Sequence, residues 1–257
     1  MAVPDRAGSA SQPYRPCVLV TRPAGQADVL LARLQDAGFD AVHAPALAIC
    51  PLPLTSAQQR LLMDVDHHHA VFFVSPNAAR LGVAALGDLW PQWPVGVHWL
   101  AVGDATAAIL RAAGLPAASP ADGFNSEAVL TLPCLQSLAE KKVLILRGDS
   151  GRELFADTLR ARGAQVQTLA LYRRECAAEF TWPAVPVDAV LVTSVESWQC
   201  LSQRAGAQLE GRLIVAGSAR IADTLRAAGH EKIEVAASPH DEDMLACLKT
   251  CLINHSG

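Results

Sequence analysis

The sequence predicts an α/β protein built of two related lobes with parallel sheets. Short apolar runs rich in β-branched residues alternate with longer runs of helical period, which is typical of parallel strands covered by helices. Two segments also recur: VLVTRP at 18–23 returns as VLILRG at 143–148, and ATAAILRAAG at 105–114 returns as RIADTLRAAG at 220–229. Because the two recurrences keep their order and a similar spacing, the chain contains two homologous halves.

Seven strands follow from the apolar runs, and we expect them at residues 17–21, 70–74, 97–102, 143–147, 188–193, 212–216 and 233–235. The clearest helices are predicted at residues 25–37, 104–113, 151–162 and 218–228. A glycine follows each of these helices at once: Gly38, Gly114, Gly163 and Gly229. Helices commonly end in the left-handed conformation, where a Cβ is unfavourable, so we assign these glycines to helix termination and to no chemistry.

Two extended stretches, at residues 41–49 and 165–174, occupy equivalent places in the repeats, and we expect them to pair as a two-stranded hinge. Two proline clusters nearby mark candidate linkers. The first is Pro45, Pro51 and Pro53, and the second is Pro183 and Pro186, which follow Trp182. In this arrangement the first lobe is discontinuous, with residues 1–45 and 173–257, and the second lobe spans residues 46–172. Residues 1–16 are polar and rich in proline, so they are predicted to be a disordered leader and not a signal peptide.

Composition argues against several classes of protein. The chain has 257 residues, of which 51% are hydrophobic, and a net charge of −4 without a basic stripe. A nucleic-acid binder would need a basic face, and a membrane span would need about 20 consecutive apolar residues. The seven cysteines include no CxxC pair. We therefore expect reduced, mostly buried thiols, no disulfide framework, no zinc ribbon and a cytoplasmic location.

Polar residues gather where strands end and helices begin, which is the functional edge of a parallel α/β sheet. The candidate ligand-binding residues are Arg22, Ser75, Pro76, Asn77, Gly103, Thr106, Arg147, Gly148, Thr193, Ser194, Gly217, Ser218 and Arg220. Single Ser, Thr or Asn side chains here are expected to cap helices. Together, several helix N-termini and three arginines suit a ligand with many carboxylates or phosphates. Each arginine has an alternative reading as a helix-end salt bridge on the surface.

Sharper motifs fail on their context. The GDSG segment at 148–151 lies between a predicted strand and helix, so its residues serve a turn and not a protease site. The three consecutive histidines at 67–69 point in different directions and are expected to form a solvated loop without metal. Neither a Walker A loop nor a GxGxxG segment follows any strand, so we expect no nucleotide and no cofactor.

Taken in order, the loops resemble the uroporphyrinogen-III synthase family. The resemblance covers nearly the whole chain and is carried by VLVTRP, FVSPNAARL, VGDATAAIL, NSEAVL, VLILRGDSGR, ALYRR, VTSVESW and the C-terminal SPHDEDMLACL. It implies two flavodoxin-like lobes joined by a two-stranded linker, the first lobe being discontinuous. It also implies a reaction without cofactor or metal: linear hydroxymethylbilane loses water, its last ring is inverted, and the macrocycle closes to uroporphyrinogen III.

The resemblance further implies that Tyr172, in ALYRR, assists departure of the hydroxyl as water. The alternative is a half-exposed strand tyrosine that packs between lobes. One departure is Arg220, which stands where some members have threonine.

The expected partner is hydroxymethylbilane, handed over transiently by hydroxymethylbilane synthase to a monomeric protein that binds no nucleic acid and no membrane. Two other readings stay open at this stage: a two-lobed module that binds an anionic solute, and a two-lobed glycosyltransferase.

Overall fold

The chain folds into two compact units. The structure is a computed structural model that describes residues 14–121, 126–151 and 153–252. Unit 1 comprises Met1–Ala48 and Cys176–Gly257, and unit 2 comprises Ile49–Glu175. The chain therefore enters unit 2 once and leaves it once. Residues 1–13 of the predicted leader lie outside the described residues.

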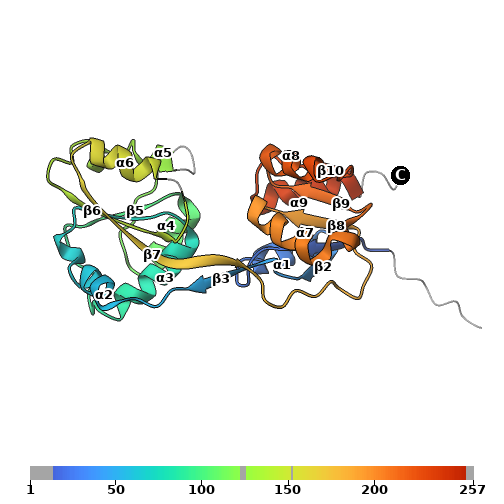
Figure 1. The fold of residues 1–257 in the computed structure, drawn as a ribbon, viewed down its shortest axis with the longest axis horizontal. Helices are drawn as coiled ribbons and strands as arrows, with labels where there is room; N and C mark the ends of the chain where they lie inside the picture. The colour runs from blue at the N-terminus through green and yellow to red at the C-terminus, as the bar shows by residue number, and fades with distance from the viewer. Residues whose placement is uncertain (1–13, 122–125, 152, 253–257) are drawn as a thin grey trace, which may run out of the picture. The chain divides into compact units, whose positions relative to one another are not determined.

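Unit 1 is built on a five-stranded sheet in the order β10-β9-β8-β1-β2, whose neighbouring strands are parallel (Figure 1). The strands are β1 (Cys17–Val20), β2 (Asp40–His43), β8 (Ala189–Val192), β9 (Leu213–Ala216) and β10 (Ile233–Val235). The helices are α1 (Asp28–Asp36), α7 (Val195–Leu209), α8 (Ala219–Ala227) and α9 (Asp241–Leu252).

Side chains of this sheet alternate between two cores, as the pleat of a strand requires. Leu19 and Val190 pack on one face with Leu201 of α7 and residues of α8. Val18 and Leu191 pack on the other face with α1 and α9. The sheet is thus covered on both faces, which explains why its central strands β1, β8 and β9 are apolar throughout and not alternating.

Unit 2 contains a second five-stranded sheet, in the order β3-β7-β6-β4-β5. Its strands are β3 (Leu47–Pro51), β4 (Ala70–Phe73), β5 (His98–Ala101), β6 (Lys142–Gly148) and β7 (Gln165–Cys176). Its helices are α2 (Ser56–Met63), α3 (Pro76–Gly87), α4 (Asp104–Ala112), α5 (Ser126–Val129) and α6 (Leu154–Ala161), with short 3₁₀ turns η1 (Val65–His67) and η2 (Pro133–Leu135).

The second sheet also has a core on each face. Phe73 and Leu146 pack with residues of α2, α3 and α4, whereas Phe72 and Ile145 pack with residues of α5 and α6. Phe72 and Phe155 of α6 lie with ring centroids 4.3 Å apart. The parallel pairs β4–β5, β4–β6 and β6–β7 direct the ends of these strands to one edge.

The seven expected strands and the four clearest helices are confirmed, with ends that shift by a few residues. The helix-ending glycines are confirmed as well: Gly38, Gly114, Gly163 and Gly229 have φ of 90°, 83°, 89° and 88°. Glycine adopts this left-handed backbone conformation at little cost in free energy, because it has no Cβ.

The extended stretch at 41–49 is not a single strand. Its first part belongs to β2, which pairs with β1, and its last part belongs to β3, which neighbours β7. The Leu52 N–H donates to the Leu171 carbonyl at 2.9 Å beside these strands. The expected pairing with residues 165–174 therefore holds only for β3. The second proline cluster, around Pro183, lies within unit 1 and is not a linker between units.

The expectation that all cysteines are reduced is wrong in this structure, because Cys176 and Cys200 form a disulfide. The fold brings the end of β7 to α7, so the two Cα atoms lie 5.2 Å apart although 24 residues separate them. Of the five free cysteines, only Cys17 is buried, and the others are half-buried.

The last residues of the predicted leader are also ordered. The Tyr14 hydroxyl donates to Asp188 at 2.6 Å, and the Arg15 guanidinium donates to the Gln35 carbonyl at 2.9 Å.

Candidate functional site

In unit 2, the loop after β4 places the predicted residues Ser75, Pro76 and Asn77 at the start of α3. Ser75 is the N-cap, since the Ala78 N–H donates to its Oγ at 3.1 Å, and Pro76 occupies the first helical position. Proline is favoured there because that N–H has no helical partner. The Asn77 amide oxygen accepts from Arg80 at 3.4 Å.

The start of α4 carries two more of the predicted residues. Gly103 is the N-cap and provides no side chain, and Thr106 is buried in the first turn. The cap residue therefore provides no side-chain acceptor for the N–H groups of this first turn.

Tyr172 lies on β7 and is buried, with 2% of the residue exposed. Its hydroxyl is 2.9 Å from Ser75 Oγ. The alternative interpretation, a half-exposed tyrosine, is thus wrong, because the ring packs inside the core of unit 2 with residues such as Phe73 and Leu146. The structure brings together two residues that the sequence separates by 97 positions.

Gly148 explains how the ring fits. The register of β6 and β7 is irregular here, so that Arg147 lies opposite Ala170 and Gly148 lies opposite Tyr172. A Cβ on Gly148 would lie 3.0 Å from Cε2 of the Tyr172 ring. The Asp149 N–H then donates to the Tyr172 carbonyl at 2.8 Å, which fixes the loop against β7. Gly148 therefore acts in the structure as space for the ring.

A positive charge lies near the same ring. The Arg174 guanidinium carbon is 6.0 Å from the centroid of Tyr172. This separation is at the limit of a cation–π contact, which stabilises by about 0.5–1 kcal/mol at an exposed site.

Arg147 is engaged within its own loop. Its side chain is largely buried and its Nη1 lies 2.7 Å from Glu153 Oε1. Gly151, at φ 148°, leaves room for it, since a Cβ there would lie 2.6 Å from Arg147 Nη2. Of the two readings offered by the sequence, the structure shows the ion pair, but with a buried guanidinium and not a surface one.

In unit 1, Arg22 is likewise held. Its guanidinium pairs with Asp241 and donates to the Pro239 carbonyl at 2.6 Å, while His43 Nε2 donates to the Arg22 carbonyl at 2.8 Å. Arg220 differs, because it is exposed and its side chain makes no hydrogen bond or ion pair with any residue that the structure describes. Arg220 is the arginine of the three that is available to a ligand.

The remaining predicted residues of unit 1 form helix starts. Ser194 caps α7 and accepts from the Ser197 N–H at 3.0 Å, and Ser218 caps α8 and accepts from the Ile221 N–H at 3.4 Å. Thr193 is half-buried. Gly217 is buried, and a Cβ on it would lie 2.9 Å from Pro239.

Sequence reasoning missed a second pair of hydroxyls. Thr21, which follows β1, is fully buried and donates to the Leu191 carbonyl at 2.7 Å. Its Oγ1 is 3.3 Å from Ser197 Oγ, on α7. A threonine directly after an apolar strand was visible in the sequence, but no local signal indicates a partner 176 positions away.

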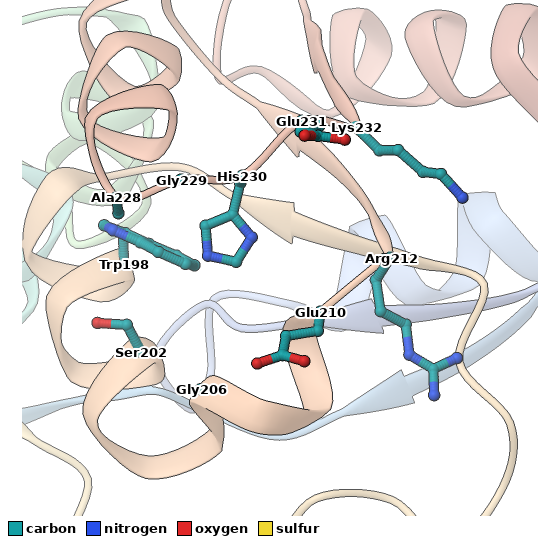
Figure 2. A pocket seen from close by; sticks show the side chains of 11 residues that line it. Trp198, Ser202, Gly206, Glu210, Arg212, Ala228, Gly229, His230, Glu231 and Lys232 are labelled. Atoms are coloured by element: carbon teal, nitrogen blue, oxygen red, sulfur yellow. The ribbon is translucent and has the colours of Figure 1, made fainter.

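A cavity of about 560 Å³ in unit 1 does not coincide with the predicted residues. It is lined by residues at the end of α7 and in the turns before β9 and β10, so it opens at the amino ends of these strands. Figure 2 shows the Glu210 carboxylate and the His230 ring directed into this space, with Lys232 directed away from it. The His230 ring packs edge-on against Trp198, with centroids 4.8 Å apart. The predicted loops lie at the opposite, carboxyl ends of the strands.

Within the residues that the structure describes, no group of three or more His, Cys, Asp or Glu is placed to hold a metal ion. The histidines at 67–69 are not one solvated loop. His68 is buried between the Asp64 carbonyl and the Gln167 side chain, and His69 contacts the Cys134 carbonyl at 2.8 Å. Over residues 14–121, 126–151 and 153–252, no helix has the length and apolar character needed to cross a bilayer.

Comparison with protein families gives one match over most of the chain: the family described as uroporphyrinogen-III synthase HemD matches residues 28–246. The chain belongs to the uroporphyrinogen-III synthase family. Uroporphyrinogen-III synthases are cyclising lyases of tetrapyrrole biosynthesis, and this is the activity of the chain. The resemblance found in the sequence is confirmed, and the readings as a solute-binding module or a glycosyltransferase are set aside.

Individual relatives agree with the family. The uroporphyrinogen-III synthase of Escherichia coli K12 is 35% identical over 249 residues, which cover 90% of this chain and 99% of that protein. The uroporphyrinogen-III synthase of Proteus mirabilis is 37% identical over 160 residues, which cover 61% of this chain and 79% of that protein.

Solved structures show the same fold at low identity. The uroporphyrinogen-III synthetase of Helicobacter pylori has a TM-score of 0.62 at 18% identity, covering 92% of this chain and 99% of that one. A mutant uroporphyrinogen III synthase of Thermus thermophilus has a TM-score of 0.59 at 20% identity, covering 93% of this chain and 99% of that one. The α/β class with parallel sheets, predicted from the sequence, is therefore confirmed.

Proposed function

We propose that this chain closes hydroxymethylbilane to uroporphyrinogen III with the loops at the carboxyl ends of its strands, and that Tyr172 supplies the proton for the first step. Family membership supports the reaction. The observation that carries the assignment of the site is the buried pair of Tyr172 and Ser75, whose oxygens are 2.9 Å apart at this edge of unit 2.

The two units, in this proposal, are the two flavodoxin-like lobes, with the discontinuous lobe at residues 1–45 and 173–257 and the other at 46–172. The strand order of unit 1 supports it. Numbered along that unit, the order β2-β1-β8-β9-β10 is 2-1-3-4-5, the order of flavodoxin-like sheets. In unit 2 the strands β5-β4-β6-β7 follow the same sequence, 2-1-3-4. The chain segments that include β3 and β7 would be the two-stranded linker.

The substrate's acetate and propionate carboxylates would be held at helix N-termini. Ser75, Gly103, Ser194 and Ser218 begin α3, α4, α7 and α8, where the positive end of the helix dipole favours anions. Arg220 adds a guanidinium without another partner among the described residues. Asn77, Pro76, Thr106, Thr193 and Gly217 shape these loops, whereas Arg22 and Arg147 contribute through the loops that their ion pairs hold.

To form the type III isomer, the protein must control the geometry of the bilane, and accelerating its cyclisation is not enough. Loss of hydroxide from a pyrrole carbinol gives a stabilised azafulvenium, and the bilane cyclises unaided to the symmetric type I isomer. To form type III, the terminal ring must be attacked at its substituted carbon, giving a spiro intermediate that fragments and recombines. Fixing the carboxylates orients the chain for this attack, and orientation can lower a barrier by several kcal/mol.

The test is a product analysis. Purified protein is mixed with freshly generated hydroxymethylbilane, the products are oxidised, and the type I and type III uroporphyrins are separated by chromatography. We expect type III to dominate. Type I at the spontaneous rate would contradict the proposed function. Tyr172→Phe should lower kcat by about 10²–10⁴ with the fold intact, the usual range for loss of a general acid; an unchanged kcat would remove Tyr172 from the mechanism.

The monomeric state, the cytoplasmic location and the hand-over from hydroxymethylbilane synthase stay predictions from the sequence.

A further inference from the structure

The Tyr172–Ser75 pair has unequal access to a ligand. Tyr172 is buried, with 2% of the residue exposed, whereas Ser75 is half-buried at the start of α3. Ser75 is therefore the more accessible residue of the pair.

The protons and lone pairs of the two hydroxyls assign a direction to the hydrogen bond between Tyr172 and Ser75. A serine hydroxyl has one proton and two lone pairs, and the Ala78 N–H occupies one lone pair of Ser75. Ser75 is the partner that the structure shows for the buried Tyr172 hydroxyl. A buried O–H without an acceptor costs about 1–3 kcal/mol, whereas the proton of the more exposed Ser75 can be given to water or to a ligand. The phenol is thus the donor and Ser75 the acceptor.

We propose a proton relay in which Ser75 gives its proton to the substrate and Tyr172 gives its own proton to Ser75. The inference rests on the proposed function and refines it. The Ser75 O–H gives its proton to the hydroxyl of the substrate's hydroxymethyl group as the C–O bond breaks, and the bonding electron pair leaves with water. The Tyr172 proton moves to Ser75 Oγ at the same time, which leaves a phenolate. When the macrocycle closes, the proton lost from the pyrrole carbon returns to the phenolate by the reverse route, so the net products are uroporphyrinogen III and water.

Two neighbours favour the negative charge on Tyr172. The phenol oxygen lies next to the N-cap of α3, at the positive end of that helix dipole. The Arg174 guanidinium lies 6.0 Å from the ring centroid. Gly148 leaves the room that the ring needs to reach Ser75, since a Cβ at this position would lie 3.0 Å from the ring. Ser75 is then a catalytic residue that touches the substrate, and not only a carboxylate binder.

The first measurement asks which oxygen donates. The chain has two tyrosines, so Tyr14→Phe makes Tyr172 the sole one. The intensity ratio of the tyrosine Fermi doublet in the Raman spectrum is low when the phenol donates a strong hydrogen bond and high when its oxygen accepts one. We expect a low ratio in Tyr14→Phe and a changed ratio in Tyr14→Phe/Ser75→Ala. A high ratio in Tyr14→Phe would overturn the relay, because Ser75 would then be the donor.

The second measurement compares variants in single-turnover kinetics with hydroxymethylbilane. Ser75→Ala and Tyr172→Phe should each lower the rate by about 10²–10⁴, and the double variant should be no slower than either. Ser75→Thr keeps the hydroxyl and should retain activity within about 10-fold. Thr55→Ala is the matched control, because Thr55 caps α2 of the same unit by accepting from the Gln58 N–H but contacts no phenol in the described structure.

The outcomes separate the two proposals. A parent protein that forms only the type I isomer refutes the proposed function, while the Raman ratio still decides the direction of the hydrogen bond. A parent that forms type III, with Tyr172→Phe inactive and Ser75→Ala close to the parent, refutes the relay alone and shows direct donation by Tyr172. Equal losses in Thr55→Ala and Ser75→Ala would also refute it, since loss of a helix cap would then explain the effect.

Discussion

Each unit has a pair of buried or half-buried hydroxyls near the carboxyl ends of its strands, and the two pairs differ in where their protons go. In unit 1, Thr21 must donate to the Leu191 carbonyl, because a carbonyl cannot donate. The 3.3 Å contact with Ser197 then has Ser197 as donor, and both protons are used. In unit 2, Tyr172 and Ser75 share one hydrogen bond, and the Ser75 proton has no carbonyl acceptor among the described residues.

The difference separates a structural network from a reactive one. The Thr21 pair ties β1, β8 and α7 together and has no proton left to give. The Ser75 pair, at the start of α3, leaves the Ser75 proton without a carbonyl acceptor among the described residues. Residues of the same chemical type at similar places in two related sheets thus serve different purposes, and substitutions in each unit should have different readouts.

The largest expected effect concerns the disulfide in unit 1. Cys176→Ser/Cys200→Ser should lower the free energy of unfolding of that unit by about 3 kcal/mol, because a cross-link over 24 residues restricts the unfolded chain. Thermal unfolding with and without reductant measures it. Cys251→Ser, which removes a half-buried free thiol of the same unit, is the control. A parent whose unfolding temperature does not respond to reductant would show that the bond contributes no stability.

A smaller effect separates the two hydroxyl pairs. Thr21→Val should cost about 1–3 kcal/mol of unfolding free energy, because it leaves the Leu191 carbonyl and Ser197 without their buried partner. Ser75→Ala should cost a similar amount, because it leaves the buried Tyr172 hydroxyl without its partner, but it should also lower activity, whereas Thr21→Val should keep its activity. Denaturant unfolding and product formation per folded molecule are measured for both variants. If Thr21→Val lost activity and kept its stability, the comparison of a structural with a reactive pair would be wrong.

Steric pressure on the Tyr172 ring should produce a change of about 10-fold in kcat, since small displacements of a reacting group are costly. Gly148→Ala places a methyl group 3.0 Å from the ring and forces it to move. Gly206→Ala is the matched control in unit 1, because its Cβ would meet no atom within 4 Å. Equal kcat values for the two variants would show that the position of the ring is not critical.

The smallest effect is a pH dependence in unit 2. Burial lowers the pKa of His98 below its ordinary value of 6.5, and the neighbouring His69 lowers it further. The unfolded chain therefore takes up the proton more readily, so stability is complete above about pH 6.5 and declines as the pH falls below it. Unfolding curves of His98→Gln between neutral and acid pH should show a weaker decline. His67→Gln, at an exposed histidine, should decline as the parent does.

The repeat in the sequence does not correspond to the two units. The segment at 18–23 includes the end of β1, in unit 1. Its copy at 143–148 lies in β6, which belongs to unit 2. The helices α4 and α8, which carry the other repeat, also belong to different units. The repeat therefore relates the halves of the chain, and each half contributes strands to both units.

Local signals predicted the fold well, because strand and helix patterns and the glycine at each helix end depend on neighbouring residues. Gly163 is an example: its position after an amphipathic run is enough to predict a left-handed φ. Non-local pairings could not be predicted in this way. Arg22 finds Asp241 at a distance of 219 positions, and the disulfide joins two cysteines with no spacing signature. The sequence could nominate Arg22 and Arg147 as anion ligands but could not show that carboxylates of the chain already occupy them.

The pairing of β1 has a consequence for synthesis on the ribosome. The Cys17 N–H donates to Asp188, 171 residues later, and β1 pairs with β8 on that side of the sheet. All of unit 2, residues 49–175, has been translated before β8 exists. In the nascent chain, the edge of β1 that later pairs with β8 therefore stays unpaired while unit 2 is completed. The strand β1 is thus among the first segments made and has β2 available early, but it is among the last to acquire its second neighbour, β8.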